Sequence, residues 1–204
     1  MAKTAREAEV RAPGRPRDEA ARKRILDASL ALMEEIGFAN LTCDGIAERA
    51  GASKATVYRW WPNKAAVVID AFVEAVTPDL PNEGAESVEE FVRMRLRSFA
   101  RVLAGRNGRV LAAVVAASQN DPEVAAAFLA HWIKPRRSIS RKYLERFQAE
   151  GTLVQHANID QILDVMYGPL QFLLMTRRCR ITTEYADSLA SLVLHGLLPR
   201  NGDG

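Results

Sequence analysis

The stretch LTCDGIAERAGASKATVYRWWPNK, residues 41–64, predicts two short helices joined by a tight turn. Thr42 is placed to cap the first helix, and Gly51 breaks that helix. Ser53 is placed to cap the second helix, which Pro62 must stop because proline has no backbone N–H to donate. This order of cap, glycine and cap is typical of a helix-turn-helix.

The two predicted helices each have an apolar side that fits the other. Ile46 and Val57 are apolar where the helices face each other, and Ala47 is small where their backbones approach closely. The remaining face of the second helix is free to enter a DNA major groove, and it carries Lys54, Ala55, Thr56, Tyr58 and Arg59. The alternative is a helical hairpin packed inside an all-α protein, with its basic side chains merely solvated.

A further helix and a basic segment precede the motif. Apolar residues recur at spacings of three and four between Asp18, a candidate N-cap, and Gly37, a candidate residue just past the helix end. Residues 1–17 have no apolar periodicity and are expected to form a disordered arm. Basic residues crowd this end of the chain: Arg6, Arg11, Arg15, Arg17, Arg22, Lys23 and Arg24. The basic end is therefore the candidate end for binding a polyanion.

The arm offers a second candidate contact with DNA. In Pro13-Gly14-Arg15-Pro16-Arg17, an extended Gly-Arg-Pro core can lay an arginine side chain into a narrow minor groove, which makes Arg15 and Arg17 candidate contacts. The open alternative is a solvated tail that contributes only nonspecific attraction.

The rest of the chain also predicts helices. Asn63 is placed to cap one of them, and each segment beyond a proline-containing loop at residues 77–84 has helical periodicity. The sequence shows no hairpin signal, no sustained β alternation and no internal repeat. The predicted fold is therefore all-α, with a disordered basic arm at 1–17, a three-helix helix-turn-helix DNA-binding domain at 18–64, a helical effector-binding and dimerisation domain at 65–198, and a disordered tail at 199–204.

The segments LT at 41–42, IAERAGASKATVYR at 46–59 and WPNK at 61–64 resemble the DNA-binding domain of TetR/AcrR-type regulators. The close resemblance covers about residues 18–72, and the remainder resembles only the family's general plan of a divergent helical ligand-binding and dimerisation domain. It implies that Tyr58 and Lys64 contact phosphates and that Thr42 caps its helix beside the DNA backbone. The full set of expected DNA-binding residues is Arg15, Arg17, Thr42, Ser53, Lys54, Ala55, Thr56, Tyr58, Arg59, Trp60 and Lys64.

Two positions depart from the family pattern. Gly45 stands where many members carry an acid that completes a capping box, so this helix lacks one stabilising contact. Trp60 stands where many members carry His or Tyr, and its indole is expected either to touch the sugar-phosphate backbone or to pack inside. Trp61, one turn after Val57, is expected in the core.

A helix-turn-helix generally binds DNA as a dimer, with recognition helices about 34 to 36 Å apart. The last two predicted helices, near residues 159–176 and 185–198, are the candidates for the interface that holds them there. The expected interface residues are Ile159, Ile162, Leu163, Met166, Leu170, Leu189, Leu192, Val193 and Leu197. The alternative is that these apolar stripes are buried against their own chain.

A ligand pocket in the helical body is expected from the family resemblance. The candidate lining residues are Phe99, Phe128, Trp132, Met166, Tyr167, Gln171 and Phe172, each of which can equally be an ordinary core residue. Gly168-Pro169 is expected to interrupt and kink the penultimate helix, which opens space for such a pocket.

Composition and motifs argue against several other classes of protein. The 204 residues are 48% hydrophobic and 26% charged, and no apolar run approaches the roughly 18 residues that a membrane span needs. The basic N-terminus lacks the apolar segment of a secretory signal, so we expect a cytoplasmic protein whose two cysteines, Cys43 and Cys179, are reduced. The sequence has no metal-ligand spacing, phosphate loop or nucleophile motif, so no cofactor, metal or enzymatic activity is expected.

These observations predict a sequence-specific transcriptional regulator. It is expected to bind a palindromic operator on double-stranded DNA as a homodimeric repressor, and a small-molecule effector is expected to release it. One alternative is a DNA-binding regulator without such an effector, which a body without a pocket would favour. The other is an all-α enzyme whose site is assembled only in the fold.

Overall fold

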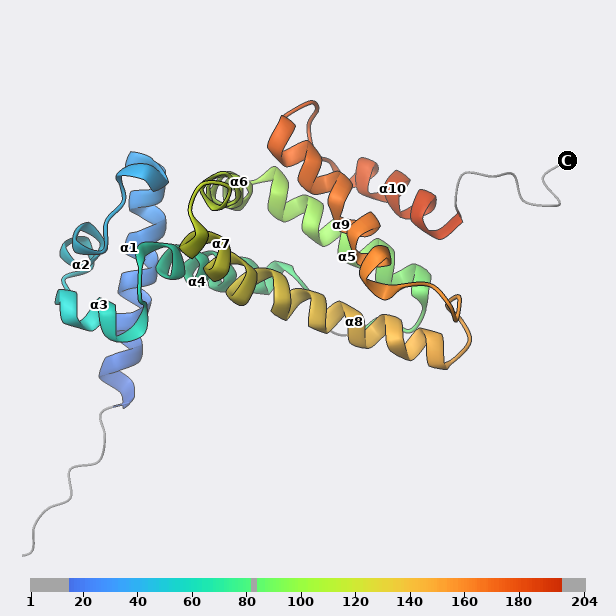
Figure 1. The fold of residues 1–204 in the computed structure, drawn as a ribbon, viewed down its shortest axis with the longest axis horizontal. Coiled ribbons are helices and arrows are strands. Elements are labelled where there is room, and N and C mark those ends of the chain that lie inside the picture. Colours follow the sequence, from blue (N-terminus) through green and yellow to red (C-terminus); the bar gives the residue numbers. More distant parts are fainter. Residues whose placement is uncertain (1–14, 82–83, 196–204) are drawn as a thin grey trace, which may run out of the picture.

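The computed structural model describes residues 15–81 and 84–195, with side chains from Glu19 onward. Within these ranges every regular element is a helix, which confirms the all-α prediction (Figure 1). The head contains α1 (Arg15–Asn40), α2 (Cys43–Ala50) and α3 (Lys54–Trp60). The body contains α4 (Lys64–Val76), a 3-10 turn η1 (Thr77–Asp79), α5 (Val88–Ala104), α6 (Arg106–Ser118), α7 (Pro122–Phe128), a π-helical turn η2 (Leu129–Ile133), α8 (Lys134–Ala149), α9 (Ile159–Thr176) and α10 (Thr183–His195).

The first helix is longer than the sequence predicts. Helix α1 begins at Arg15, so the expected cap at Asp18 is wrong, and residues 15–17 are helical rather than part of a disordered arm. Gly37 has φ 74° and ψ 167°, which kinks the chain before a short last turn. A positive φ is least costly at glycine, so Gly37 does end the regular helix, as predicted. The predicted arm at 1–14 and tail at 199–204 lie outside the described residues.

Helix α4 belongs to both the head and the body. It packs against α1 on one side and against α6 and α7 on the other, between the two ends of the molecule (Figure 1). Its buried residues are Ala65, Ala66, Val67, Val68, Ile69, Ala71, Phe72 and Val76. Two ion pairs add to the junction, one between Arg106 and Glu34 and one of 2.7 Å between Arg22 and Glu74. A domain boundary at 64/65 therefore falls at the start of a helix that both parts share.

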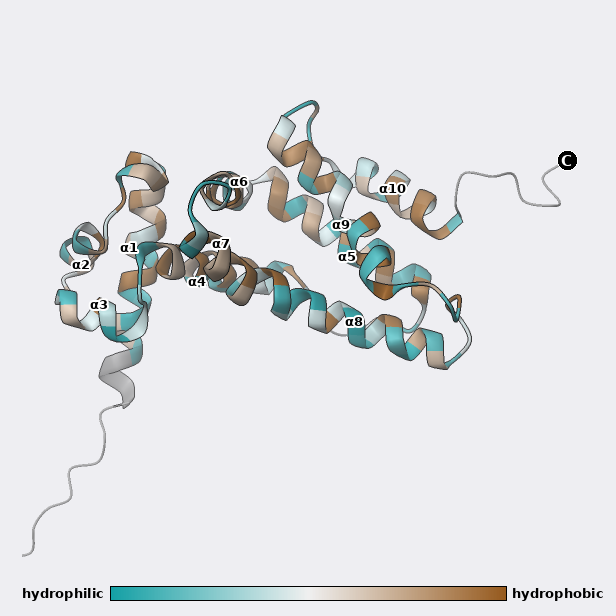
Figure 2. Ribbon diagram, in the orientation of Figure 1, coloured by the Kyte–Doolittle hydropathy of each residue, from teal (hydrophilic) through white to brown (hydrophobic). Residues whose placement is uncertain are grey.

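The body helices differ in how much apolar surface they bring to the core. Figure 2 shows a largely hydrophilic α8 beside strongly hydrophobic stretches of α4 and α9. Helix α8 nevertheless buries Ser140, Leu144 and Phe147, and it packs against α5 and α9. Helix α10 covers α5 and buries Ala186, Leu189 and Ala190.

Pro135 lies close to the start of α8, in a helical run that extends from α7 to α8. Proline has no N–H to donate, and its ring clashes with the carbonyl four residues earlier, that of His131. The chain widens here into η2, where hydrogen bonds span five residues rather than four. Both His131 and Trp132 lie in this turn, and both contact α4.

Gly108 allows a close contact between the end of α5 and the start of α6. A Cβ at this position would lie 2.0 Å from the carbonyl oxygen of Leu103 and 2.7 Å from its carbonyl carbon. Both are backbone atoms, which cannot rotate out of the way as a flexible side chain can.

Gly108→Ala is therefore expected to destabilise the fold by about 1–3 kcal/mol, because the α5–α6 corner must shift to accept the methyl group. Thermal unfolding followed by circular dichroism measures this as a lower Tm. Gly105→Ala is the matched control, since its Cβ would come no closer than 3.8 Å to the backbone of Arg101. Equal Tm values for the two variants would contradict the proposed role of the corner.

Candidate DNA-binding surface and effector cavity

The predicted caps begin the helices of the motif. Thr42 begins α2 and Ser53 begins α3, where each hydroxyl accepts a hydrogen bond from the backbone N–H three residues later, at 3.0 and 3.1 Å. Asn63 caps α4 in the same way. Gly51 has φ 60° and ψ 38°, the left-handed conformation that ends α2 and turns the chain toward α3.

Buried apolar residues fix the orientation of the recognition helix α3. Ile46 and Val57 are completely buried between the helices, as predicted. Trp61 is 2% exposed, so its predicted place in the core is confirmed. Its indole N–H donates to a carboxylate oxygen of Asp70 in α4 at 2.8 Å. The end of α3 is thereby fastened to the helix that follows it.

The opposite face of α3 is open. Lys54, Ala55 and Arg59 are exposed, Tyr58 is 54% exposed and Trp60 is 37% exposed. Trp60 is therefore a surface residue rather than a core residue. This face combines hydrogen-bond donors, cations and flat rings on one short helix, which suits contact with bases and phosphates.

The two candidate lysines have protein partners in the free chain. The Lys54 ammonium donates to Asp44 at 2.6 Å, and this hydrogen bond raises the pKa of Lys54. The Lys64 ammonium donates to the carbonyl oxygens of Phe38 and Ala39 at 3.0 and 3.2 Å. A DNA phosphate would compete with a carboxylate for Lys54 and with neutral carbonyls for Lys64.

Arg15 and Arg17 do not lie in an extended segment. Both belong to the first turn of α1, and their side chains lie outside the described residues. The predicted extended core for the minor groove is therefore corrected at these two positions.

Polar and aromatic contacts connect the head to the body through α4. One carboxylate oxygen of Asp70 accepts a hydrogen bond from Trp61. The other, Oδ1, lies 3.1 Å from the Nδ1 atom of His131 in η2. Phe72 meets Trp132 edge to face, with ring centroids 4.7 Å apart. A movement of η2 would therefore reach α4 by direct contact.

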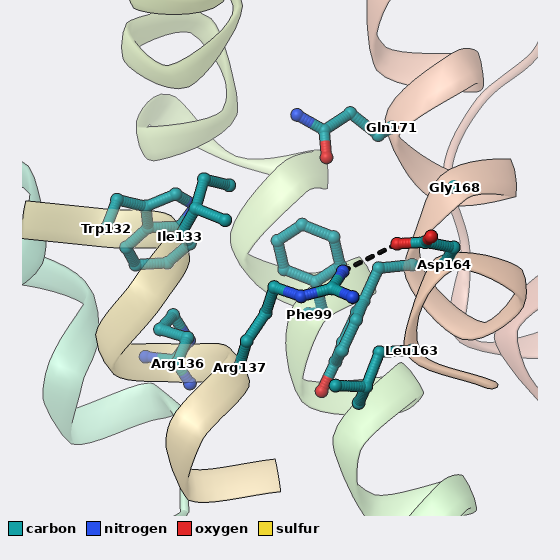
Figure 3. A pocket seen from close by; sticks show the side chains of 10 residues that line it. Phe99, Trp132, Ile133, Arg136, Arg137, Leu163, Asp164, Gly168 and Gln171 are labelled. Carbon is teal, nitrogen blue, oxygen red and sulfur yellow. Dashed lines mark hydrogen bonds and ion pairs between the residues drawn. The ribbon is translucent and has the colours of Figure 1, made fainter. Parts of the chain in front are cut away.

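A cavity of about 210 Å³ lies in the body between η2, α8 and α9, with Phe99 of α5 in its wall (Figure 3). Its lining consists of Phe99, Trp132, Ile133, Arg136, Arg137, Leu163, Asp164, Tyr167, Gly168 and Gln171. Four of the predicted lining residues, Phe99, Trp132, Tyr167 and Gln171, are among them.

Three predicted lining residues lie elsewhere. Phe128 and Met166 are buried but do not line this cavity, and Phe172 is 57% exposed on the surface of α9. Helix α9 continues through Pro169, so the expected interruption of the helix is wrong. Gly168 does line the cavity, where the lack of a side chain leaves room.

The lining residues that sequence reasoning missed follow a simple helical spacing. On the η2–α8 side the lining falls at 132, 133, 136 and 137, and on α9 it falls at 163, 164, 167, 168 and 171. These are the positions that share one face of a helix with Trp132 and with Tyr167. Extending the prediction by one turn from each of these aromatic residues would have found Arg136 and Asp164.

The cavity wall is charged as well as apolar. Arg137 donates to Asp164 at 2.6 Å, as Figure 3 shows, and to Asp160 at 3.0 Å. Arg136 lies over the Trp132 ring at 4.8 Å from its centroid. Burial lowers the pKa of Arg136 to about 10, and the positive charge of Arg95 contributes to the shift.

The predicted dimer interface is corrected in part. Leu163, Met166 and Leu170 are completely buried within their own chain, and Ile159 and Leu189 are nearly so. Ile162 and Val193 are half-buried, and Leu197 lies outside the described residues. Large apolar side chains that remain open on these helices are Val165, Phe172 and Met175 of α9 and Leu192 of α10. Of the predicted set, Leu192 alone is an exposed residue within the described ranges.

Two family models match the chain over its two parts. The model for bacterial regulatory proteins of the tetR family matches residues 25–71. The model for the tetracyclin repressor-like C-terminal domain matches residues 83–193.

Within residues 15–81 and 84–195, no group of three or more His, Cys, Asp or Glu side chains is arranged to hold a metal ion. No helix in these ranges is long and apolar enough to cross a membrane.

Individual proteins resemble the chain over most of its length. The HTH-type transcriptional regulator YdeS of Bacillus subtilis is 35% identical over 184 residues, which span 90% of this chain and 93% of YdeS. The solved structure of the TetR family transcription regulator SCO0332 has a TM-score of 0.76 and 26% identity, covering 88% and 99% of the two chains. FadR of Thermus thermophilus, a transcriptional repressor solved in complex with lauroyl-CoA, has a TM-score of 0.66 and 25% identity, covering 90% and 98%.

The two cysteines differ in exposure and should differ in reactivity. Cys43 is buried at the start of α2, and Cys179 is exposed. Burial raises the pKa of Cys43, although a hydrogen bond with Tyr58 opposes the shift. Since the thiolate is the reactive form, a chromogenic disulfide reagent at mildly alkaline pH is expected to modify one thiol quickly and the second only on unfolding.

Single substitutions identify the two phases of this reaction. Cys179→Ser should remove the fast phase, and Cys43→Ser should leave it unchanged. Two thiols that react at the same rate in the folded protein would show that α2 opens far more readily than its packing implies.

Proposed function

The chain belongs to the TetR family of helix-turn-helix transcriptional regulators, and we propose that it represses transcription by binding a palindromic operator as a homodimer. A small-molecule effector that enters the helical body releases the repressor from DNA. The protein acts in the cytoplasm, together with its operator.

The observation that carries this proposal is the two-sided construction of α3. Val57 is completely buried while Tyr58, one residue later, is 54% exposed, so the helix is held rigidly and still presents a reading face. Its N-terminal residues Ser53, Lys54 and Ala55 are exposed at the end that approaches base edges in a helix-turn-helix complex. Tyr58 and Lys64 contact phosphates beside them.

Dimerisation sets the spacing of two such helices along DNA. The exposed apolar side chains of Val165, Phe172, Met175 and Leu192 support an interface built from α9 and α10 of both subunits. This interface uses the exposed face of α9, which lies away from the residues that α9 buries in its own chain.

Effector binding acts on the head through α4. The cavity is walled by Trp132, whose ring packs on Phe72, and the neighbouring His131 contacts Asp70. A ligand that favours a different position of η2 would shift α4 and change the spacing of the two heads. A coupling free energy of about 1–3 kcal/mol suffices to change operator affinity by a factor of 5 to 150. The presence of a cavity whose wall residue Trp132 packs on α4 favours this function over a regulator without an effector.

Selection of bound duplexes from a random pool tests the DNA-binding surface. The parent chain is expected to enrich one palindrome. Tyr58→Phe and Lys54→Ala are expected to weaken binding to it by about fivefold or more, because each removes a polar contact with DNA. Lys64→Ala should also lower the slope of log affinity against log salt by about 0.9, the value for one phosphate contact.

Lys142→Ala is the matched control for this test, since Lys142 is exposed on α8, far along the chain from the head. It should bind like the parent. No enrichment of any sequence, or equal affinity of the three head variants and the control, would contradict the proposed surface.

Phe172→Glu tests the proposed interface. A negative charge inside this interface should raise the dissociation constant of the dimer by at least about tenfold, because an ionised carboxylate loses hydration when it is buried. Sedimentation velocity across a concentration series measures this change. Leu129→Glu, at another exposed apolar position in η2, should leave the dimer intact. A Phe172→Glu chain that sediments like the parent would place the interface on another surface.

A further inference from the structure

The guanidinium groups of Arg136 and Arg95 interact with each other, and neither has a carboxylate partner among the described residues. Of the two, only Arg136 lines the cavity. In the part of the chain that the structure describes, Arg136 has no hydrogen bond or ion pair, and its contact is with the Trp132 ring. Arg95 is 4% exposed and donates only to neutral groups: the Pro81 carbonyl at 2.7 Å, Ser140 at 2.9 Å and Tyr167 at 3.3 Å. Their like charges repel, and no acid of the described ranges forms a hydrogen bond or ion pair with either group.

The neighbouring arginines of α8 show that this imbalance is local. Arg137 pairs with both Asp160 and Asp164 of α9, and Arg141 pairs with Asp160 as well. The acids that face α8 are therefore engaged by Arg137 and Arg141. Arg136 lines the cavity instead, below the ring of Trp132 in Figure 3.

An isolated buried cation is costly, and an anion beside it recovers much of that cost. Of the acids and bases that line the cavity, Asp164 is already paired with Arg137, so Arg136 is the lining charge that remains uncompensated. A planar guanidinium favours a carboxylate, whose two oxygens match its two N–H groups.

The rest of the wall is aromatic and aliphatic. Phe99, Trp132 and Tyr167 contribute rings, and Ile133 and Leu163 contribute branched aliphatic side chains. The volume of about 210 Å³ is below the roughly 300–1,000 Å³ typical of pockets for drug-sized ligands. The space suits one small, flat, apolar body attached to the anionic group.

We propose that the cavity binds small aromatic carboxylates, with Arg136 as the counter-ion and the rings of Phe99 and Trp132 against the apolar body. The inference rests on the proposed function, because it names the chemical class of the effector. The class is distinct from a long acyl thioester, which is much larger than a cavity of about 210 Å³.

Calorimetric titration of the full chain without DNA tests the proposal. The probes are trans-cinnamate and benzoate, each compared with its neutral amide, which has nearly the same shape. Each carboxylate is expected to bind at least about tenfold more tightly than its amide, because a charge-assisted hydrogen bond is worth more than a neutral one. Arg136→Gln should remove this preference for the carboxylate.

Arg141→Gln is the matched control, since it deletes the same charge from the same helix outside the cavity. It should retain the preference. Arg136→Gln should also unfold at a temperature equal to or above that of the unliganded parent, because it removes an uncompensated cation. This second measurement shows that the lost preference is not caused by misfolding.

Amides that bind as tightly as the acids, an unchanged preference in Arg136→Gln, or no binding of either carboxylate at millimolar concentration would each overturn the proposal. Adding trans-cinnamate to the complex with the selected palindrome separates this inference from the proposed function. Binding to the free chain without release of DNA would uphold the carboxylate site and contradict the effector role. Release of DNA by the neutral amide, without any preference for the carboxylate, would support the effector role and contradict the carboxylate site.

Discussion

Burial of α4 on nearly every side is the constraint on which the rest of the structure depends. Residues 65–69 are consecutive and all buried, which a helix with a single apolar stripe cannot achieve. Such a helix needs cover on two sides, and α1 supplies one while α6 and α7 supply the other. The head therefore cannot turn against the body without repacking this core, and packed cores favour discrete arrangements over gradual deformation.

The head was largely predictable because its signals are local. Thr42, Ser53 and Gly51 act within one turn of themselves, and a cap or a left-handed glycine can be recognised without knowing the tertiary fold. Apolar periodicity places the start of α1 at Asp18, three residues late, because residues 15–17 carry no apolar pattern. Proline is tolerated in the first turn of a helix, where its missing N–H has no intrahelical partner to lose.

The body was predictable in class but not in detail. Apolar spacing identified α9, yet it could not say whether Leu163 and Met166 face their own subunit or another, and both are buried in their own chain. The charges illustrate the same limit. Arg136 and Arg137 are adjacent in sequence and chemically identical, but their ion pairing differs. The register of α8 against α9 places Asp160 and Asp164 next to Arg137. That register is a tertiary property, which no periodicity within one helix contains.

The three tryptophans of the chain lie at three points along the proposed coupling between the cavity and the DNA-binding face. Trp60 lies on the reading face, Trp61 joins the head to α4, and Trp132 stands in the cavity wall. Indole emission responds to local polarity and to nearby quenching groups, so the molecule carries its own optical reporters of DNA contact, of the contact between the head and α4, and of ligand occupancy. Replacing two of the three tryptophans by phenylalanine gives three variants, each with a single tryptophan. The order in which their emission changes after a ligand is added would show whether the cavity, the α4 contact or the DNA-binding face responds first.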